Sequence, residues 1–217
     1  MAMAGVHCTV NFGVNADDVC YVSMPMFHGN ALMACWAPGL AAGSTIVLRR
    51  KFSASGFLPD VRRYGITYFT YVGRTIAYIL AQPPNDHDRD HHLRLGFGTE
   101  ASGPDRERFA ERFGCPLLEG YGSSESVVVI NRTPDTPANA LGIPRADLDV
   151  AVIDPATSQV CPPAVFDEHG ALANGHEAIG EIVNRTGGGM FEGYYNNGEA
   201  TGERLRNGWY WTGDLAY

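Results

Sequence analysis

The stretch LRLGFGTEASGPDRERFAERFGCPLLEG, residues 93–120, decides the class of fold. Its opening LRLGF predicts a β-strand. The segment PDRERFAERFG predicts a helix, because Pro104 suits the first turn of a helix and Gly114 suits the left-handed position after the last turn. PLLEG then predicts a second strand. A strand, a helix and a strand in this order form the crossover unit of a parallel sheet, so this part of the chain is predicted to be α/β.

The same alternation extends outward from this unit. Further strands are predicted at 18–24, 44–49, 66–72 and 127–131, and further helices at 30–43, 53–65 and 74–82. The predicted fold class is therefore α/β, with a mostly parallel sheet flanked by helices.

After about Leu141 the sequence changes to short strands separated by Gly-, Pro- and Asn-rich turns. The strands are predicted at 149–154, 180–184 and 208–211, with one short helix at 199–205. This pattern predicts a small antiparallel β subdomain. The expected domains are residues 1–140, which would carry the acyl and adenine sites, and residues 141–217.

The composition excludes several classes of function. The chain has 217 residues, 45% of them hydrophobic, and a formal net charge of −8 with an isoelectric point near 5.3. An acidic surface repels phosphate backbones, so nucleic acid is not an expected partner. Five scattered cysteines without a C-x-x-C pair argue against a disulfide framework or a zinc ribbon and favour a reducing compartment.

The sequence does not predict export or membrane insertion. Residues 1–13 lack the basic and apolar regions of a signal peptide. The longest apolar run, residues 31–42, contains Pro38 and is shorter than the about 20 residues that a membrane-spanning helix needs. We therefore expect a cytoplasmic protein without a transmembrane segment.

The end of the strand PLLEG carries residues suited to a nucleotide. Ligands of open α/β sheets bind beyond the carboxyl ends of the strands, and EGYGSSES, residues 119–126, lies at such an end. The ring of Tyr121 could stack on a base, the serine hydroxyls could donate to a phosphate oxygen, and Glu125 offers the hard oxygen ligand that Mg²⁺ prefers. The alternative is a packed aromatic residue in an ordinary turn.

Two other patterns suggest different chemistry and are weaker. Gly96, Gly98 and Ala101 fit the G-x-G-x-x-A pattern of a nicotinamide-dinucleotide turn, but the predicted helix begins too late for a full match. His87 and His91 could hold a metal, but their segment follows Pro-Pro and has no helical periodicity. The favoured interpretations are a glycine-permitted turn and a solvated loop.

Read together and in order, these strings resemble the adenylate-forming superfamily of acyl-CoA synthetases, luciferases and peptide-synthetase adenylation domains. EGYGSSES is similar to its Y-G-x-[ST]-E motif, and GEIVNRTGGGMFEGYYNN with ERLRNGWYWTGDLAY is similar to its G-E-[IL]…G-Y…GW…TGD segment. PMFHGN resembles its P-[LM]-F-H motif, and FGTEAS falls where the family has an adenine-lining turn. The strings are closest to bacterial fatty-acid-CoA ligases and very-long-chain acyl-CoA synthetases. The chain would then be part of the N-terminal domain of such an enzyme.

The resemblance implies a nucleotide-binding role for several residues. Tyr121 would stack on the adenine of ATP or AMP, Glu119 would face the adenine amino group, and Asp214 would bind the ribose hydroxyls. The remaining positions around the adenine would be Gly98, Thr99, Glu100 and Gly120.

The resemblance also implies the catalytic residues. Ser124 would donate to the α-phosphate, Glu125 would be the Mg²⁺ ligand, and His28 would lie beside the carboxylate of the acyl substrate. The substrates of the whole enzyme would be a fatty acid, ATP and CoA.

The chain departs from the family pattern in two places. The Ser/Thr/Gly-rich phosphate loop that precedes PMFHGN and the C-terminal domain with its catalytic lysine are not in this sequence, whose only lysine is Lys51. We therefore expect a central fragment that is inactive alone and self-associates through uncovered sheet edges. A non-catalytic remnant that binds acyl chains or a partner is the main alternative, and a nicotinamide-dependent oxidoreductase is a weaker one.

Overall fold

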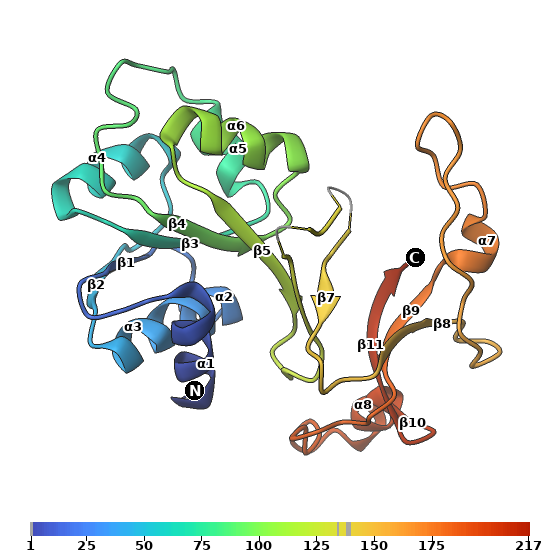
Figure 1. Ribbon diagram of the computed structural model, residues 1–217. Helices are drawn as coiled ribbons and strands as arrows, with labels where there is room; N and C mark the ends of the chain where they lie inside the picture. The colour runs from blue at the N-terminus through green and yellow to red at the C-terminus, as the bar shows by residue number, and fades with distance from the viewer. Residues whose placement is uncertain (1, 134, 138–139) are drawn as a thin grey trace. The chain divides into compact units, whose positions relative to one another are not determined.

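The computed structural model describes residues 2–133, 135–137 and 140–217 (Figure 1). By contact the chain divides into two compact units. The first consists of Met1–Gly120 and Arg132–Leu141, and the second of Tyr121–Asn131 and Gly142–Tyr217.

The first unit contains a parallel sheet with the strand order β2-β1-β3-β4-β5. The strands are β1 (Val19–Val22), β2 (Thr45–Leu48), β3 (Tyr68–Val72), β4 (Leu95–Thr99) and β5 (Leu117–Gly122). The order of addition reverses between β1 and β3, which is the position where open α/β sheets bind ligands. The predicted α/β class with a mostly parallel sheet is confirmed.

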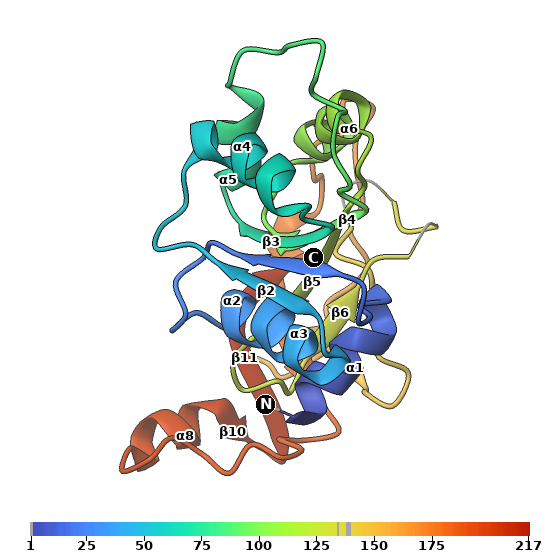
Figure 2. The same cartoon turned by 90° about the vertical axis from the view of Figure 1, so that its left-hand side faces the viewer.

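Helices cover both faces of this sheet (Figures 1 and 2). One face carries α1 (Ala2–Phe12), α2 (Gly29–Ala31), the π-helical segment η1 (Leu32–Trp36) and α3 (Ala37–Ala42). The other face carries α4 (Ala54–Tyr64), α5 (Thr75–Leu80) and α6 (Gly103–Phe113). Neighbouring residues of β3 divide between two core clusters, Tyr68 on the α1–α3 side and Phe69 on the α4–α6 side, as the alternation of a strand requires.

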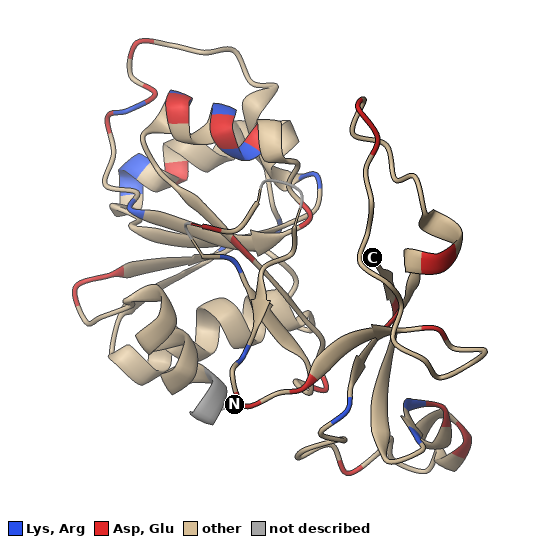
Figure 3. Cartoon of the chain, turned by 45° about the vertical axis from the view of Figure 1, so that its right-hand side comes forward, with Lys and Arg blue, Asp and Glu red and all other residues tan. Residues whose placement is uncertain are grey.

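Local signals set the ends of the predicted helices. The Ser53 hydroxyl accepts a hydrogen bond from Gly56 N at 3.2 Å and begins α4. Gly65 and Gly114 have left-handed backbones and end α4 and α6, as predicted. Figure 3 shows acidic and basic residues interspersed along α6, as expected of a helix face in contact with solvent.

The predicted helix at 30–43 is divided, because the π-helical segment η1 ends at Trp36 and α3 begins at Ala37, one residue before Pro38. Pro38 lies in the first turn of α3 and has no N–H for the Ala34 carbonyl four residues before it. That carbonyl instead accepts a hydrogen bond from the Tyr68 hydroxyl at 2.7 Å. A side chain of the sheet therefore satisfies the backbone group that the proline leaves free.

The second unit is built from antiparallel strands. Its four-stranded sheet has the order β10-β11-β9-β8, from β8 (Val150–Ile153), β9 (Gly180–Asn184), β10 (Leu205–Arg206) and β11 (Trp209–Ala216). A second pair is formed by β6 (Val129–Asn131) and β7 (Ile143–Pro144), and the helices are α7 (Gly175–Ala178) and α8 (Gly198–Arg204). The predicted small antiparallel sheet is confirmed, and β11 continues past the predicted 208–211 because it bulges and then pairs with β9 again.

Among the described residues, no helix has the length and apolar character needed to cross a membrane.

Candidate functional site

The predicted residues divide between the two units. The first unit holds His28, Gly98, Thr99, Glu100, Glu119 and Gly120, and the second holds Tyr121, Ser124, Glu125 and Asp214. Within the first unit, parallel pairing places Tyr71 of β3 beside Gly98 of β4, and Gly98 beside Glu119 of β5.

Gly98 allows the ring of Tyr71 to lie against β4. A Cβ atom at Gly98 would collide with the Tyr71 carbonyl oxygen and would lie 2.5 Å from the ring. Burial raises the pKa of the Tyr71 phenol, which donates to the Leu118 carbonyl at 3.2 Å. Glycine is therefore required here by the packing of the sheet itself.

The carboxylate of Glu119 is held by donors from the turn after β4 and from α6. Its Oε1 accepts from Ala101 N at 2.6 Å, and its Oε2 accepts from Arg106 Nη1 at 2.5 Å. The same Nη1 donates to the Ala101 carbonyl at 2.8 Å. Glu119 and Arg106 thus fix both backbone groups of Ala101, directly after the predicted adenine-lining residues.

The turn that follows β4 has an uncommon backbone. Glu100 has φ +68°, a left-handed conformation that non-glycine residues adopt at a cost. Thr99 pairs with Val72, and its carbonyl accepts from Gly73 N at 3.0 Å. The ends of β3 and β4 are therefore tied to each other where the turn begins.

His28 is exposed and begins the short helix α2. Its Nδ1 accepts from Asn30 N at 3.2 Å, so in the neutral ring Nε2 carries the proton. Asn30 Nδ2 donates to the Tyr71 carbonyl at 3.1 Å, while its buried Oδ1 has no hydrogen-bond partner among the described residues. These contacts attach the His28 loop to the carboxyl end of β3, next to the strand that carries Gly98.

In the second unit, Tyr121 and Asp214 are direct partners. The Tyr121 hydroxyl donates to Asp214 Oδ2 at 2.5 Å. Burial and this hydrogen bond raise the pKa of Tyr121. Two motifs that lie far apart in the sequence thus supply an aromatic ring and a carboxylate at one place.

Ser124 and Glu125 lie in a tight turn after β5. Ser126 N donates to the Ser123 carbonyl at 3.0 Å and closes the turn, and the Ser124 side chain is exposed. Glu125 Oε1 accepts from the Tyr194 hydroxyl at 2.6 Å. Desolvation raises the pKa of Glu125, but hydrogen bonds from Tyr194 and Ser123 outweigh it and hold this pKa below its usual value. Glu125 is therefore ionised at neutral pH.

The surroundings of Glu125 fit a magnesium ion bound together with phosphates. The described residues contain no cluster of three or more His, Cys, Asp or Glu side chains that could hold a metal alone. Mg²⁺ usually takes one or two carboxylates and completes its shell with water and substrate phosphates. Glu125 offers one ionised carboxylate, with Oε1 oriented by Tyr194, which matches that pattern.

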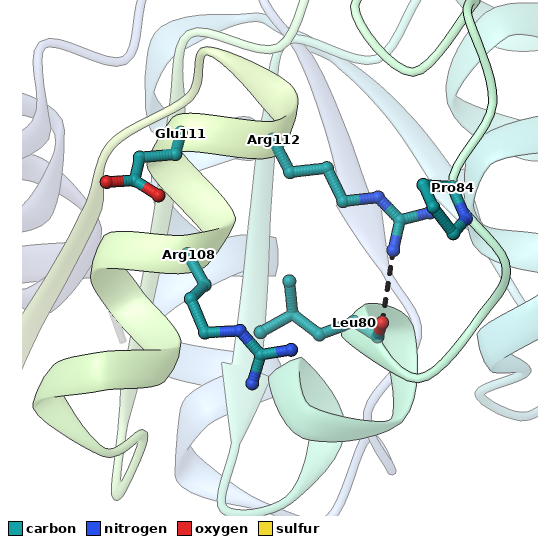
Figure 4. A pocket seen from close by; sticks show the side chains of 5 residues that line it. All are labelled: Leu80, Pro84, Arg108, Glu111 and Arg112. Atoms are coloured by element: carbon teal, nitrogen blue, oxygen red, sulfur yellow. Dashed lines mark hydrogen bonds between the residues drawn. The ribbon is translucent and has the colours of Figure 1, made fainter.

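A cavity of about 410 Å³ lies in the first unit, between the end of α5 and α6, and its lining includes none of the predicted site residues (Figure 4). Arg112, on its border, donates to the Leu80 carbonyl at 3.0 Å and forms an ion pair with Asp88 at 2.7 Å. Asp88 is only 5% exposed and anchors the loop, whereas the other residues of 85–90 are exposed, as expected of a solvated loop. His87 and His91 bond locally, to Asp90 and to Leu93 N.

Partners of the predicted residues were not found by sequence reasoning. Arg106 lies within a segment predicted only as a helix, and Tyr194 lies in the string GYYNN, whose pattern predicts no role for this tyrosine. No spacing rule links either of them to Glu119 or Glu125, because the contacts depend on the folded strands and turns.

Comparison with known proteins gives a family match and several similar proteins. The family described as AMP-binding enzyme matches residues 1–195. The chain is 54% identical over 209 residues to the steroid-22-oyl-CoA synthetase of Rhodococcus jostii, covering 96% of the chain and 38% of that protein. It is 49% identical to the medium/long-chain-fatty-acid–CoA ligase FadD17 of Mycobacterium marinum, covering 100% of the chain and 40% of that protein. The chain thus spans about two fifths of the length of these relatives.

Solved structures share the fold. The O-succinylbenzoate coenzyme A synthetase of Bacillus subtilis in complex with AMP superposes with a TM-score of 0.73 at 24% identity, covering 99% of this chain and 42% of that one. ATP-bound MatB from Rhodopseudomonas palustris superposes with a TM-score of 0.76 at 22% identity, covering 99% of this chain and 40% of that one.

Proposed function

Because the chain belongs to the family of AMP-binding enzymes, we propose that it forms the central part of an acyl-CoA ligase. The proposed reaction has two steps. The carboxylate of the acid attacks the α-phosphorus of ATP, which forms an acyl-adenylate and releases pyrophosphate. The thiol of CoA then attacks the acyl carbonyl, which forms the thioester and releases AMP.

The hydrogen bond between Tyr121 and Asp214 is the observation that carries this proposal. It places an aromatic face next to a carboxylate, at 2.5 Å between hydroxyl and Oδ2. A ring suits an adenine base, and a carboxylate can accept from two neighbouring ribose hydroxyls. The proposal assigns Tyr121 to the base and Asp214 to the ribose.

The turn after β5 would bind the α-phosphate and the metal ion. Ser124 is exposed and would donate to an α-phosphate oxygen, and ionised Glu125 would hold Mg²⁺. The metal, when bound, would offset negative charge on the phosphates. Tyr194 would keep the Glu125 carboxylate oriented toward that position through its hydrogen bond at 2.6 Å.

The first unit holds the other residues that we assign to adenine and to the acyl substrate. Gly98, Thr99, Glu100, Glu119 and Gly120 would form the wall of the adenine site. His28 would lie near the acyl carboxylate, which is supported by its place beyond the carboxyl end of β1.

The substrate would be a large apolar carboxylic acid. The two relatives described above are named for a steroid-22-oyl-CoA product and for medium- and long-chain fatty acids. A cytoplasmic enzyme acting on small molecules also fits the five free thiols and the acidic composition.

Pyrophosphate exchange in the full-length ligase tests the proposal. We expect ATP–pyrophosphate exchange that depends on dodecanoic acid or on a steroid side-chain carboxylic acid. Asp214→Ala should raise the KM for ATP at least about 10-fold. Asp147→Ala, an exposed acid of the same unit paired with Arg145, is the matched control and should leave the KM unchanged. Exchange at background with both acids would contradict the ligase assignment and favour a non-catalytic remnant.

A further inference from the structure

Glu181 is a buried acid that the proposed function leaves without a role. It lies on β9, in the string GEIVN, and is 9% exposed. A buried carboxylate is costly unless donors satisfy it, so its partners show what it stabilises. Those partners lie on β10 and in the middle of β11.

The strand opposite Glu181 bulges at the predicted ribose-binding residue. Trp211 pairs with Val183 and Leu215 pairs with Glu181, so one residue of β9, Ile182, faces Thr212, Gly213 and Asp214 of β11. Such a bulge redirects side chains and breaks the regular ladder of hydrogen bonds. The bulge therefore decides where the Asp214 carboxylate points.

Glu181 satisfies the backbone of this bulge. Its Oε1 accepts from Gly213 N at 2.7 Å, and its Oε2 accepts from Arg206 Nη2 at 3.2 Å. The Arg206 guanidinium lies 4.1 Å from the ring centre of Trp211, and Trp211 Nε1 donates to the Arg206 carbonyl at 3.3 Å. The carboxylate is thus held from both sides and is aimed at the N–H of Gly213.

The residues on either side of Gly213 complete the arrangement. Gly213 has φ +80°, and a Cβ atom here would collide with the Arg204 guanidinium. The Thr212 hydroxyl donates to the Ile182 carbonyl at 2.8 Å and accepts from Asp214 N at 3.1 Å. Glu181 and Thr212 therefore hold two consecutive backbone N–H groups, those of Gly213 and Asp214.

We propose that Glu181 is a positioning residue for ribose recognition, acting through Gly213 on the Asp214 carboxylate. The inference rests on the proposed function, because it assumes that Asp214 binds the ribose. Glu181 itself would not touch the nucleotide. Its loss would let the bulge relax and would move the carboxylate that Tyr121 holds at 2.5 Å.

The first experiment measures the bulge in this chain without any ligand. Glu181→Met keeps the size of the side chain and removes the acceptor. We expect the Gly213 amide to exchange with deuterium at least about 10-fold faster than in the parent chain, while amides of β8 are unchanged. Glu177→Ala, an exposed acid of the same unit, is the control. An unchanged Gly213 amide in Glu181→Met would overturn the proposal.

The second experiment measures ribose recognition in the full-length ligase. Glu181→Met should raise the KM for ATP about 10-fold, which corresponds to about 1.4 kcal/mol, and reduce the preference for ATP over 2′-deoxy-ATP and 3′-deoxy-ATP. The KM for the carboxylic acid should not change. Glu181→Gln should restore part of the preference, because its amide oxygen can still accept from Gly213 N. Thr212→Val should also reduce the preference for ATP over the two deoxynucleotides. This variant is used instead if Glu181→Met does not fold.

A double variant separates this inference from the proposed function. In an Asp214→Ala background, Glu181→Met should add little further loss, because both changes act on the same contact. Full additivity of the two losses would overturn the positioning role. If Asp214→Ala alone leaves the preference for ATP over the deoxynucleotides unchanged, the ribose assignment of Asp214 fails, whatever Glu181 does.

Discussion

Replacing Arg106 by methionine should destabilise the first unit, because it leaves the Glu119 carboxylate without its cation. The two side chains are 16% and 14% exposed and meet at 2.5 Å. Removing one partner of a buried ion pair costs about 3–5 kcal/mol. Glu119 keeps the hydrogen bond from Ala101 N at 2.6 Å, so we expect a loss of about 2–3 kcal/mol.

Urea unfolding followed by circular dichroism measures this loss. The matched control is Arg108→Met on the same helix, because the Arg108 side chain is 64% exposed and lies 3.4 Å from Asp105. An exposed pair of this kind contributes little, and the control should stay within about 0.5 kcal/mol of the parent chain. Equal losses for Arg106→Met and Arg108→Met would refute the reasoning.

A double-variant cycle then assigns the loss to the pair. Glu119→Gln keeps an acceptor for Ala101 N and removes the charge that Arg106 neutralises. The combined Arg106→Met, Glu119→Gln variant should be more stable than the sum of the single losses predicts, by about 1–2 kcal/mol. Additive losses would mean that Arg106 stabilises α6 by packing rather than by compensating Glu119.

Four further outcomes follow from the structure. Tyr121→Ala in the full-length ligase should weaken AMP binding, measured by calorimetry, by about 1–3 kcal/mol, which is the range for stacking of an aromatic ring on a base. Unchanged AMP affinity in a folded variant would exclude the stacking role. Glu125→Gln should lower the rate of adenylation much more than the affinity for the acid, which single-turnover kinetics separates. Asp88→Asn should lower the free energy of unfolding by about 2–3 kcal/mol at neutral pH. Desolvation raises the pKa of Asp88, but its hydrogen bonds to Arg112 and Asn85 outweigh this and lower the pKa. The stability difference between parent and variant should therefore be complete above the pKa of an unfolded aspartate and should decline as the pH falls through the lowered pKa. The isolated chain should show no thioester formation and should self-associate in sedimentation. We expect self-association because β2 is the edge strand of its sheet and its residue Leu48 is 57% exposed. A monomer at high concentration would contradict this expectation.

The elements that the sequence predicts well are those with local signals at both ends. Ser53 and Gly65 delimit α4, and Gly114 ends α6, through contacts within a few residues. Helix α1 was not predicted, because its packing depends on a distant partner. A Cβ atom at Gly5 would lie 2.7 Å from the Ala37 carbonyl oxygen, so this glycine is needed for α1 to approach α3. A glycine that is explained by tertiary contact looks like a helix breaker in the sequence alone.

The same limit applies to the candidate site. The motif strings indicated which residues carry carboxylates and rings, but not which donors each carboxylate would find. Glu181 is the clearest example, because the letters GEIVN predict a strand and give no sign of the β11 bulge that this side chain satisfies. A bulge depends on the register between two strands that lie apart in the sequence, and no periodicity within either strand reveals it.

The four acidic residues of the candidate site and the β11 bulge differ in their hydrogen-bond partners, and these partners indicate different roles. Glu119 and Glu181 accept from arginines, Arg106 and Arg206, and from backbone N–H groups. An arginine neutralises the charge of the carboxylate, so these two acids are better suited to hold a backbone turn in place than to bind a cation.

Glu125 and Asp214 accept instead from tyrosine hydroxyls, at 2.6 Å and 2.5 Å. A neutral hydroxyl orients a carboxylate and leaves its charge in place. The carboxylate can then accept a magnesium ion or a pair of ribose hydroxyls. The choice of tyrosine at these two acids and arginine at the other two is therefore the physical reason to assign the magnesium ion and the ribose to the first pair, and the holding of a backbone turn to the second.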